Sequence, residues 1–161
     1  MQLTSYTDYA FRTLIALAAV APNKLTAAQI SDGYGISQNH LLKVVHRLAE
    51  LGFVETSRGK SGGIRLLVEP KALRLGAVVR ALEPELGLVA CLRTGEAPCA
   101  ITPACGLKSI LTEAMARFMS VLDEHTLADA ITSKGRVAQL LTLRPSPEAR
   151  TQRQTAQRHR S

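Results

Sequence analysis

The chain has 161 residues and a net charge of +7; 46% of its residues are apolar and 4% aromatic, which suits one domain with a hydrophobic core. Its longest apolar run, Leu14 to Ala21, is too short to cross a bilayer, and Asp8 and Arg12 interrupt the segment where a signal peptide would lie. These features argue against membrane-spanning and secreted proteins, and they predict a cytoplasmic protein whose thiols stay reduced.

The positive charge is unevenly distributed. Residues 1–82 contain ten Lys and Arg against five Asp and Glu, whereas residues 83–142 contain five against seven. Residues 143–161 contain five Arg against one Glu. A basic first half favours binding to a polyanion, most often a nucleic acid.

Three helices are predicted first. Residues 3–22 have helical spacing of apolar residues, with Thr4 or Ser5 as the cap and Asp8 in the first turn. A second, shorter helix begins at Thr26 and ends at the glycines 33–35. Ser37 is predicted to cap a third helix, which ends at Gly52.

Two short β-type runs follow, at residues 53–56 and 64–68, with a basic glycine-rich turn between them. A further short helix is expected over residues 74–82. Three helices followed by a basic hairpin are typical of a winged helix-turn-helix. The predicted fold is therefore mainly α with a small β-hairpin, with a winged helix-turn-helix DNA-binding domain over residues 1–82 and a long helix toward the C-terminus.

The second half of the chain divides into three parts. Residues 83–106 form a loop that contains every cysteine. Residues 107–142 are predicted to form a dimerisation helix, starting near Thr102–Pro103, and a short helix after Thr126. The alternative is that the long helix packs back onto the DNA-binding domain. Residues 143–161 are predicted to be a disordered basic tail with only non-specific attraction to DNA.

The third helix has the composition of a recognition helix. In a helix-turn-helix, the first residues of the second helix enter the major groove. Gln and Asn side chains suit paired contacts to adenine, and Ser and Lys suit phosphates or guanine. The candidate DNA-binding residues are Ser37, Gln38, Asn39, His40 and Lys43 on this helix, with Arg58 and Lys60 at the tip of the wing.

Cys91, Cys99 and Cys105 follow the spacing C-x7-C-x5-C. A zinc site would ordinarily offer C-x2-C pairs, which are absent here. Wider spacing suits a larger object such as an iron–sulfur cluster, and three thiolates would leave one corner for an oxygen or nitrogen ligand. Unbound cysteines, or a thiol redox pair with one spectator, remain the alternatives from spacing alone.

Three segments carry a resemblance to a known family: QLTSYTDYAFRTLIAL, SQNHLLKVVHRLAELGFVETSRGKSGGIRL and RALEPELGLVAC…CAITPACGLK. Over roughly residues 1–131 they resemble the winged-helix iron–sulfur transcriptional regulators that include NsrR and IscR. Within that family they are most similar to the nitric-oxide-sensing repressors.

The resemblance implies a homodimer on a two-fold symmetric DNA operator and an iron–sulfur cluster held by Cys91, Cys99 and Cys105. The 4Fe–4S form is preferred to the 2Fe–2S form. It also implies a fourth ligand from the partner subunit, at the position of Asp8; Glu85 and Glu96 are the rival carboxylates in the same chain.

The function expected from this resemblance is a repressor of nitric oxide detoxification genes, with nitric oxide as its signal. Two alternatives share the fold: an iron–sulfur-cluster or iron-status regulator, and a cluster-free thiol redox sensor. An enzyme is not expected, because the sequence offers no nucleotide-binding loop, no Ser–His–Asp arrangement and no paired catalytic carboxylates.

Overall fold

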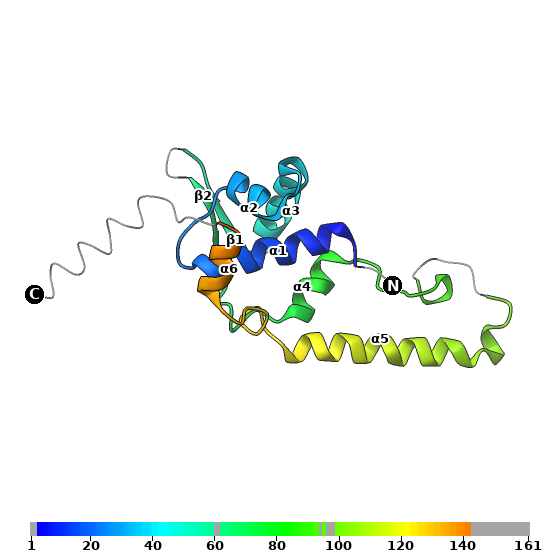
Figure 1. The fold of residues 1–161 in the computed structure, drawn as a ribbon. Coiled ribbons are helices and arrows are strands. Elements are labelled where there is room, and N and C mark those ends of the chain that lie inside the picture. Colours follow the sequence, from blue (N-terminus) through cyan, green and yellow to red (C-terminus); the bar gives the residue numbers. More distant parts are fainter. Residues whose placement is uncertain (1–2, 60–61, 94, 96–98, 143–161) are drawn as a thin grey trace, which may run out of the picture.

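A computed structural model describes residues 3–59, 62–93, 95 and 99–142 of the chain. It confirms the mainly helical fold with one antiparallel hairpin (Figure 1). Two short 3-10 helices, Ala90–Leu92 and Thr102–Ala104, lie between the helix that ends at Leu82 and the helix that begins at Gly106. In chain order the main elements are α1 (Ser5–Val20), α2 (Ala27–Tyr34), α3 (Gln38–Glu50), β1 (Val54–Ser57), β2 (Gly63–Leu66), α4 (Leu75–Leu82), α5 (Gly106–Glu124) and α6 (Lys134–Leu140).

Local capping explains where the first helices begin. The Thr4 hydroxyl accepts a hydrogen bond from the Thr7 N–H at the start of α1. Thr26 and Gln29 form a capping box at α2, in which the side chain of each accepts from the main-chain N–H of the other. Ser37 occupies the position before α3, but its hydroxyl makes no capping hydrogen bond, so that part of the prediction is wrong.

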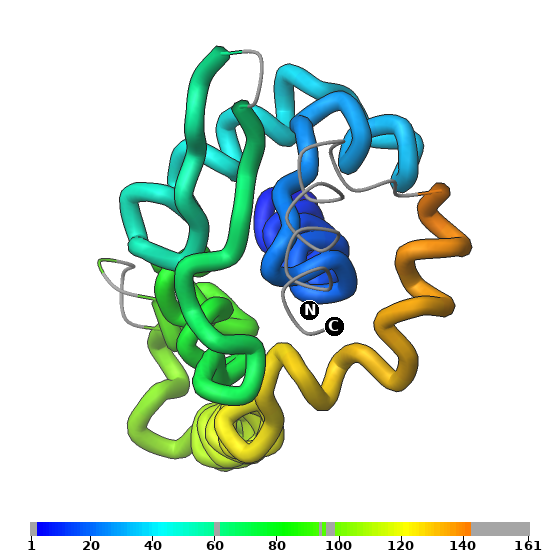
Figure 2. The backbone as a smooth tube through the Cα atoms, turned by 90° about the vertical axis from the view of Figure 1, so that its left-hand side faces the viewer, coloured from blue at the N-terminus to red at the C-terminus, as the bar shows by residue number. Residues whose placement is uncertain are grey.

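Helix α1 forms the centre of the fold. Figure 2 looks nearly along this helix and shows α2, α3, the hairpin, α5 and α6 arranged around it. Leu14 and Leu17 on α1 are fully buried. Burial of one such side chain contributes about 1.5 to 3 kcal/mol, so the contacts of α1 determine how the other elements are oriented. The neighbouring elements contribute Ile30, Leu41, Val44, Leu48, Val54, Ile64, Leu73, Val78 and Leu127 to the same core.

The hairpin is the wing of the predicted domain. Its strands pair from Val54 opposite Leu66 to Ser57 opposite Gly63, within one or two residues of the predicted ranges. Main-chain hydrogen bonds between Leu25 and Ile64 join the hairpin to the segment that precedes α2. The wing is therefore held at a fixed position beside the three helices.

Helix α5 is attached to the domain along one side only. It packs against α4, where the Arg80 guanidinium makes a two-pronged ion pair with Asp123, Nη1 lying 2.7 Å from Oδ1. Met119 is the one buried residue of its nineteen. Figure 1 shows α5 below the domain, extending well beyond it at its N-terminal end. The alternative prediction is that this helix packs back onto the DNA-binding domain. Within the described part of the chain, the structure shows such packing only where α5 contacts α4.

One predicted helix start in the second half is wrong, and the predicted short helix after Thr126 is present as α6. Helix α5 does not begin at Thr102–Pro103: those residues form a 3-10 turn, and Cys105 in an extended conformation separates it from α5. After Thr126 the chain makes a single turn, in which the Asp129 carboxylate accepts from the Thr126 N–H and hydroxyl. The short helix, α6, starts only after Ser133, whose hydroxyl caps it.

Some predictions concern residues outside the described ones, namely Lys60, Glu96 and the predicted tail, residues 143–161. Among the helices that the structure does describe, none has the length and apolar character needed to cross a membrane.

Candidate functional site

Helix α3 has one buried and one exposed face. Leu41, Val44 and Leu48 are fully buried and hold the helix against α1 and α2. The candidate DNA-binding residues of this helix are all exposed: Ser37, Gln38, Asn39, His40 and Lys43. The first turn of α3 therefore presents a polar surface, as a helix that enters the major groove requires.

The wing lies at the same end of the domain as α3, on the opposite side from α5 (Figure 1). Arg58 at the tip of the hairpin is exposed. At the base of the wing, Lys24 Nζ donates to Ser57 Oγ at 2.9 Å, and Arg65 pairs with Glu55 across the two strands. Arg58 thus remains available for a DNA backbone while other basic side chains are engaged within the fold.

The three cysteines lie outside the hydrophobic core, on the segment between α4 and α5. Cys91 is in the first 3-10 helix, Cys99 is exposed, and Cys105 directly precedes α5. All three are free thiols, and no set of three or more metal ligands converges within the described residues. The donor chemistry nevertheless fits an iron–sulfur cluster, since thiolates bind such clusters. At Cys105, an anionic cluster would also meet the positive end of the α5 dipole.

Asp8 lies in the first turn of α1, with a side chain that is 46% exposed. It makes a two-pronged pair with Arg12, with Nε 3.1 Å from Oδ1 and Nη2 2.9 Å from Oδ2. The hydrogen bond to Asp8 raises the pKa of Arg12, whose guanidinium also lies over the Tyr34 ring at 5.7 Å. Asp8 is therefore accessible from outside the protomer. A metal centre that bound its carboxylate would compete with Arg12 for the same oxygens.

Glu83 joins the cysteine segment to the start of α1. Its Oε1 accepts hydrogen bonds from the Thr4 N–H and the Thr4 hydroxyl, both at 2.8 Å. Burial raises the pKa of Glu83, but hydrogen bonds from Thr7 and Thr4 outweigh that effect and lower the pKa below its ordinary value. The carboxylate is thus held ionised next to the positive end of the α1 dipole.

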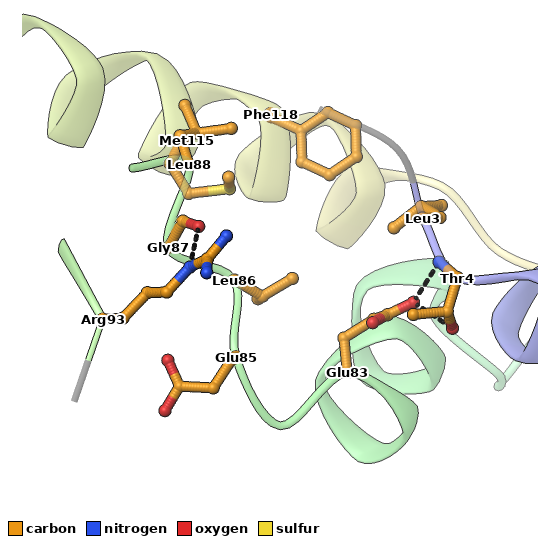
Figure 3. Close-up of a pocket in the computed structure, with 10 residues that line it drawn as sticks. All are labelled: Leu3, Thr4, Glu83, Glu85, Leu86, Gly87, Leu88, Arg93, Met115 and Phe118. Atoms are coloured by element: carbon orange, nitrogen blue, oxygen red, sulfur yellow. Dashed lines mark hydrogen bonds between the residues drawn. The ribbon is translucent and has the colours of Figure 1, made fainter. Parts of the chain in front are cut away.

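A cavity of about 190 Å³ separates the start of α1 from the cysteine segment and α5 (Figure 3). Arg93 Nε donates to the Gly87 carbonyl at 3.3 Å and so closes the turn that contains Cys91. The cavity is lined by Leu3, Thr4, Glu83, Glu85, Leu86, Gly87, Leu88, Arg93, Met115 and Phe118. Three parts of the chain that are far apart in sequence therefore meet around this cavity.

The same end of α1 also contacts α3, the candidate recognition helix. The Tyr6 hydroxyl donates to the Lys43 carbonyl at 3.0 Å. Burial is the main cause that raises the pKa of Tyr6. Between the two helices lies a second cavity of about 200 Å³, lined by Ser5, Tyr6, Tyr9, His40, Lys43 and Val44. The first turn of α1, which contains Asp8, therefore adjoins His40 and Lys43, two of the candidate DNA-binding residues.

Comparison with known proteins decides the family. Residues 3–133 match the model of the Rrf2 family, described as iron-dependent transcriptional regulators. The chain belongs to the Rrf2 family. It is 46% identical, over 145 residues, to the HTH-type transcriptional regulator NsrR of Bacillus subtilis (strain 168), covering 89% of this chain and 99% of that one. It is also 42% identical to NsrR of Shouchella clausii (strain KSM-K16), covering 92% of this chain and all of that one.

Solved structures show the same Rrf2 architecture. CymR (YrzC), the global cysteine regulator of B. subtilis, is 26% identical with a TM-score of 0.66, over 81% of this chain and 95% of that one. IscR of T. potens, 24% identical with a TM-score of 0.63, covers 81% and 86% and supports the fold. The chain is thus a helix-turn-helix transcriptional regulator and not an enzyme, as the sequence predicted.

Three residues of this Rrf2 chain were not singled out by the sequence. Arg12 as the partner of Asp8 could have been inferred from the four-residue spacing on one helix. Tyr6 and Glu83 could not, because their partners lie 37 and 79 residues away. Their role depends on which elements pack together, which no local pattern indicates.

Proposed function

We propose that this Rrf2 regulator is a nitric-oxide-sensing repressor in the cytoplasm, whose iron–sulfur cluster controls binding to the operators of nitric oxide detoxification genes. The observation that most strongly supports this is the set of three free cysteines on the segment between the DNA-binding domain and α5. The relatives named NsrR, at 42 and 46% identity over nearly their whole length, point the same way.

Cys91, Cys99 and Cys105 would hold the cluster, as 4Fe–4S in preference to 2Fe–2S. Once bound, such a cluster supplies iron with which nitric oxide can react. Asp8 of the partner subunit is the proposed fourth ligand, supported by its exposure on α1. Within each subunit Arg12 would hold the Asp8 carboxylate in position and would keep it paired whenever the ligand bond is absent.

The proposed assembly is a homodimer formed through α5. An apolar stripe on α5 supports this assembly. It lies on the side of the helix that the rest of the chain does not cover, and there Leu107 and Ile110 are 58% and 63% exposed. Ala114 and Val121 continue the stripe at helical spacing. A second copy of α5 would bury this surface, and two recognition helices would then face a two-fold symmetric operator.

In this proposal α1 connects the signal to DNA. It adjoins the cysteine segment through Glu83, and α3 through Tyr6. Ser37, Gln38, Asn39, His40 and Lys43 would read the major groove, and Arg58 and Lys60 would contact the backbone or the adjacent minor groove. The two states of the proposed dimer are those with and without an intact cluster. A difference of about 3 kcal/mol in their free energies of DNA binding would change operator affinity more than a hundredfold.

The test is an anaerobic absorption spectrum before and after nitric oxide is added, with iron, sulfide and operator affinity measured on the same sample. We expect cluster absorption that nitric oxide bleaches, together with loss of operator binding. Cys99→Ser should give a folded protein without cluster or specific binding. Asp8→Asn should alter the response to nitric oxide, whereas Asp32→Asn, an exposed carboxylate on α2, should not.

The same experiment separates the two alternatives. A cluster that controls DNA binding through iron supply, with no response to nitric oxide, would favour an iron–sulfur-cluster or iron-status regulator. A colourless protein that remains iron-free after anaerobic reconstitution would favour a thiol redox sensor and would contradict the proposed cluster.

A further inference from the structure

Helix α3 has one apolar side chain on its exposed face. All 13 residues of this helix are described, and among those that are exposed only Leu42 is apolar, at 48% exposure. Leu41, its neighbour in sequence, is fully buried. The packing of α3 on the domain thus depends on Leu41 and leaves much of Leu42 in contact with water.

Leu42 lies among the candidate DNA-binding residues. Side chains three and four residues apart are neighbours on a helix surface, so Leu42 adjoins Gln38 and Asn39 in the preceding turn. A long side chain on a helix also points back toward the N-terminus, which brings Leu42 closer to that turn. His46, four residues later with a 79% exposed side chain, continues the same face. Leu42 thus presents an apolar surface between polar ones.

The other edge of the exposed face of α3 adjoins α1. There His40 and Lys43 line the cavity of about 200 Å³ between the two helices. Since successive residues of an α-helix are separated by about 100°, Leu42 lies roughly 160° around the helix from His40. Leu42 is therefore on the edge away from α1 and does not belong to that cavity.

The major groove of DNA offers one apolar group to such a side chain. Base edges present hydrogen-bond donors and acceptors there, and the 5-methyl group of thymine is the apolar exception. A leucine side chain has no hydrogen-bonding atom and so cannot pair with the polar edges. The amides of Gln38 and Asn39 suit adenine, the base that pairs with thymine. A single A·T pair therefore offers suitable partners to neighbouring side chains of α3.

We propose that Leu42 contacts the 5-methyl group of a thymine in the half-site bound by α3 and is a specificity-determining residue of this regulator. The contact removes apolar surface of both groups from water, and burial of one methyl group changes affinity by about fourfold. Any other base at that position lacks the methyl group and places a polar edge against the leucine. The inference rests on the DNA binding proposed above but not on the type of cluster.

The test uses deoxyuridine, which differs from thymidine only in lacking the 5-methyl group. The probe is a duplex operator selected from a random library by the full-length, anaerobically purified protein. Each thymine of one half-site is replaced in turn by uracil, and the affinity is measured. We expect at least one position at which the wild type loses about fourfold in affinity. Leu42→Ala should bind the thymine and uracil forms of that position equally.

Two variants serve as controls. Leu42→Met keeps an apolar side chain at the same place and should retain the preference for thymine. Leu67→Ala removes a leucine of similar exposure, 52%, that lies after β2 and outside α3, and it should also retain the preference.

The proposal is overturned if the wild type binds every uracil duplex as tightly as the operator, a result that depends on no variant. It is also overturned if Leu42→Ala keeps the full loss of the wild type at the sensitive position, because another group would then contact the methyl. A wild type that selects no sequence from the library would instead contradict the proposed function itself.

Discussion

Glu83 is a charged side chain in an almost closed environment, only 8% exposed. Two hydrogen bonds from Thr4 and the nearby positive end of the α1 dipole stabilise its charged form. Because its pKa is lowered from 4.5, ionised Glu83 stabilises the folded state fully above about pH 4.5. That contribution is lost as the pH falls from there through the folded-state pKa.

Glu83→Gln should therefore lower the free energy of unfolding by about 1 kcal/mol at neutral pH, because the neutral amide accepts weaker hydrogen bonds. The difference from wild type should shrink as the pH falls below 4.5, where Glu83 itself becomes protonated. Urea unfolding over a pH series measures both effects. Glu69→Gln, an exposed site, is the control; a pH-independent loss in Glu83→Gln would contradict this explanation.

Gly87 has no room for a side chain. A β-carbon there would lie 2.7 Å from Arg93 Cγ and 2.8 Å from the Leu92 carbonyl oxygen. Gly87→Ala should therefore displace the turn that contains Cys91 and reduce iron and sulfide per chain, with little change in the unfolding of the core. Gly106→Ala, beside Cys105 but with open space around it, is the matched control. Normal iron content in Gly87→Ala would refute the steric argument.

At the scale of elements, α1 and α3 share one long-range hydrogen bond, from the Tyr6 hydroxyl to the Lys43 carbonyl. Its acceptor is a main-chain group in the part of α3 that carries the side chains proposed to read DNA. The bond therefore fixes the position of the helix itself. Because the acceptor is the main-chain carbonyl, the side chains on the exposed face of α3 stay available for DNA.

Tyr6→Phe should reduce affinity for the operator by about fivefold, since the loss of one hydrogen bond costs about 1 kcal/mol, and should leave non-specific binding unchanged. Parallel titrations with operator and random duplexes measure this difference. Tyr9→Phe, which alters the same cavity, is the control. Equal losses on both duplexes would show that the bond stabilises the protein generally and does not position α3.

The elements that the sequence predicted well are those defined locally. The capping box of Thr26 and Gln29 and the left-handed Gly35 are signals within one short stretch, and α2 begins and ends accordingly. The start of α5 was not predictable, because Pro103 suits the first turn of either a 3-10 or an α-helix. The contact of Glu83 with Thr4 spans 79 residues and follows only from the packing of α4 on α1.

The candidate site divides in the same way. Leu41, Val44 and Leu48 recur at helical spacing and are buried, so they define the inner face of α3. The polar residues between them therefore lie on the exposed face, and the sequence could predict their exposure. The spatial relation between the cysteines and Asp8 could not be predicted, because the proposed ligand set spans two subunits. In the described residues of one chain, no set of three metal ligands comes together.

At the scale of the whole molecule, α5 is a helix of nineteen residues with a single buried side chain, Met119. Its attachment to α4 includes the exposed pair of Arg80 and Asp123, and exposed ion pairs contribute little to stability. An apolar stripe that begins at Leu107 and Ile110 is exposed along α5. Monomeric proteins rarely expose contiguous apolar surface of this kind, and such surface marks an interaction site. The position of α5 should therefore depend strongly on a second copy of the chain.

Ile110→Glu should convert the proposed dimer into a monomer, because the proposed interface would bury an unpaired carboxylate. Analytical ultracentrifugation over a range of concentrations measures the change, and the melting temperature should become independent of concentration. Ala116→Glu, exposed on another side of α5, should remain dimeric. A dimeric Ile110→Glu variant would place the interface elsewhere.

The cysteines belong to no part of the hydrophobic core, which is formed by α1 to α4, the hairpin and the turn near Leu127. Insertions, deletions or exchanges of residues between α4 and α5 can therefore accumulate without loss of the folded DNA-binding domain. An ancestral regulator could thus acquire a new signal while it kept its operator. This separation is consistent with one architecture serving both a regulator named for cysteine and regulators named NsrR.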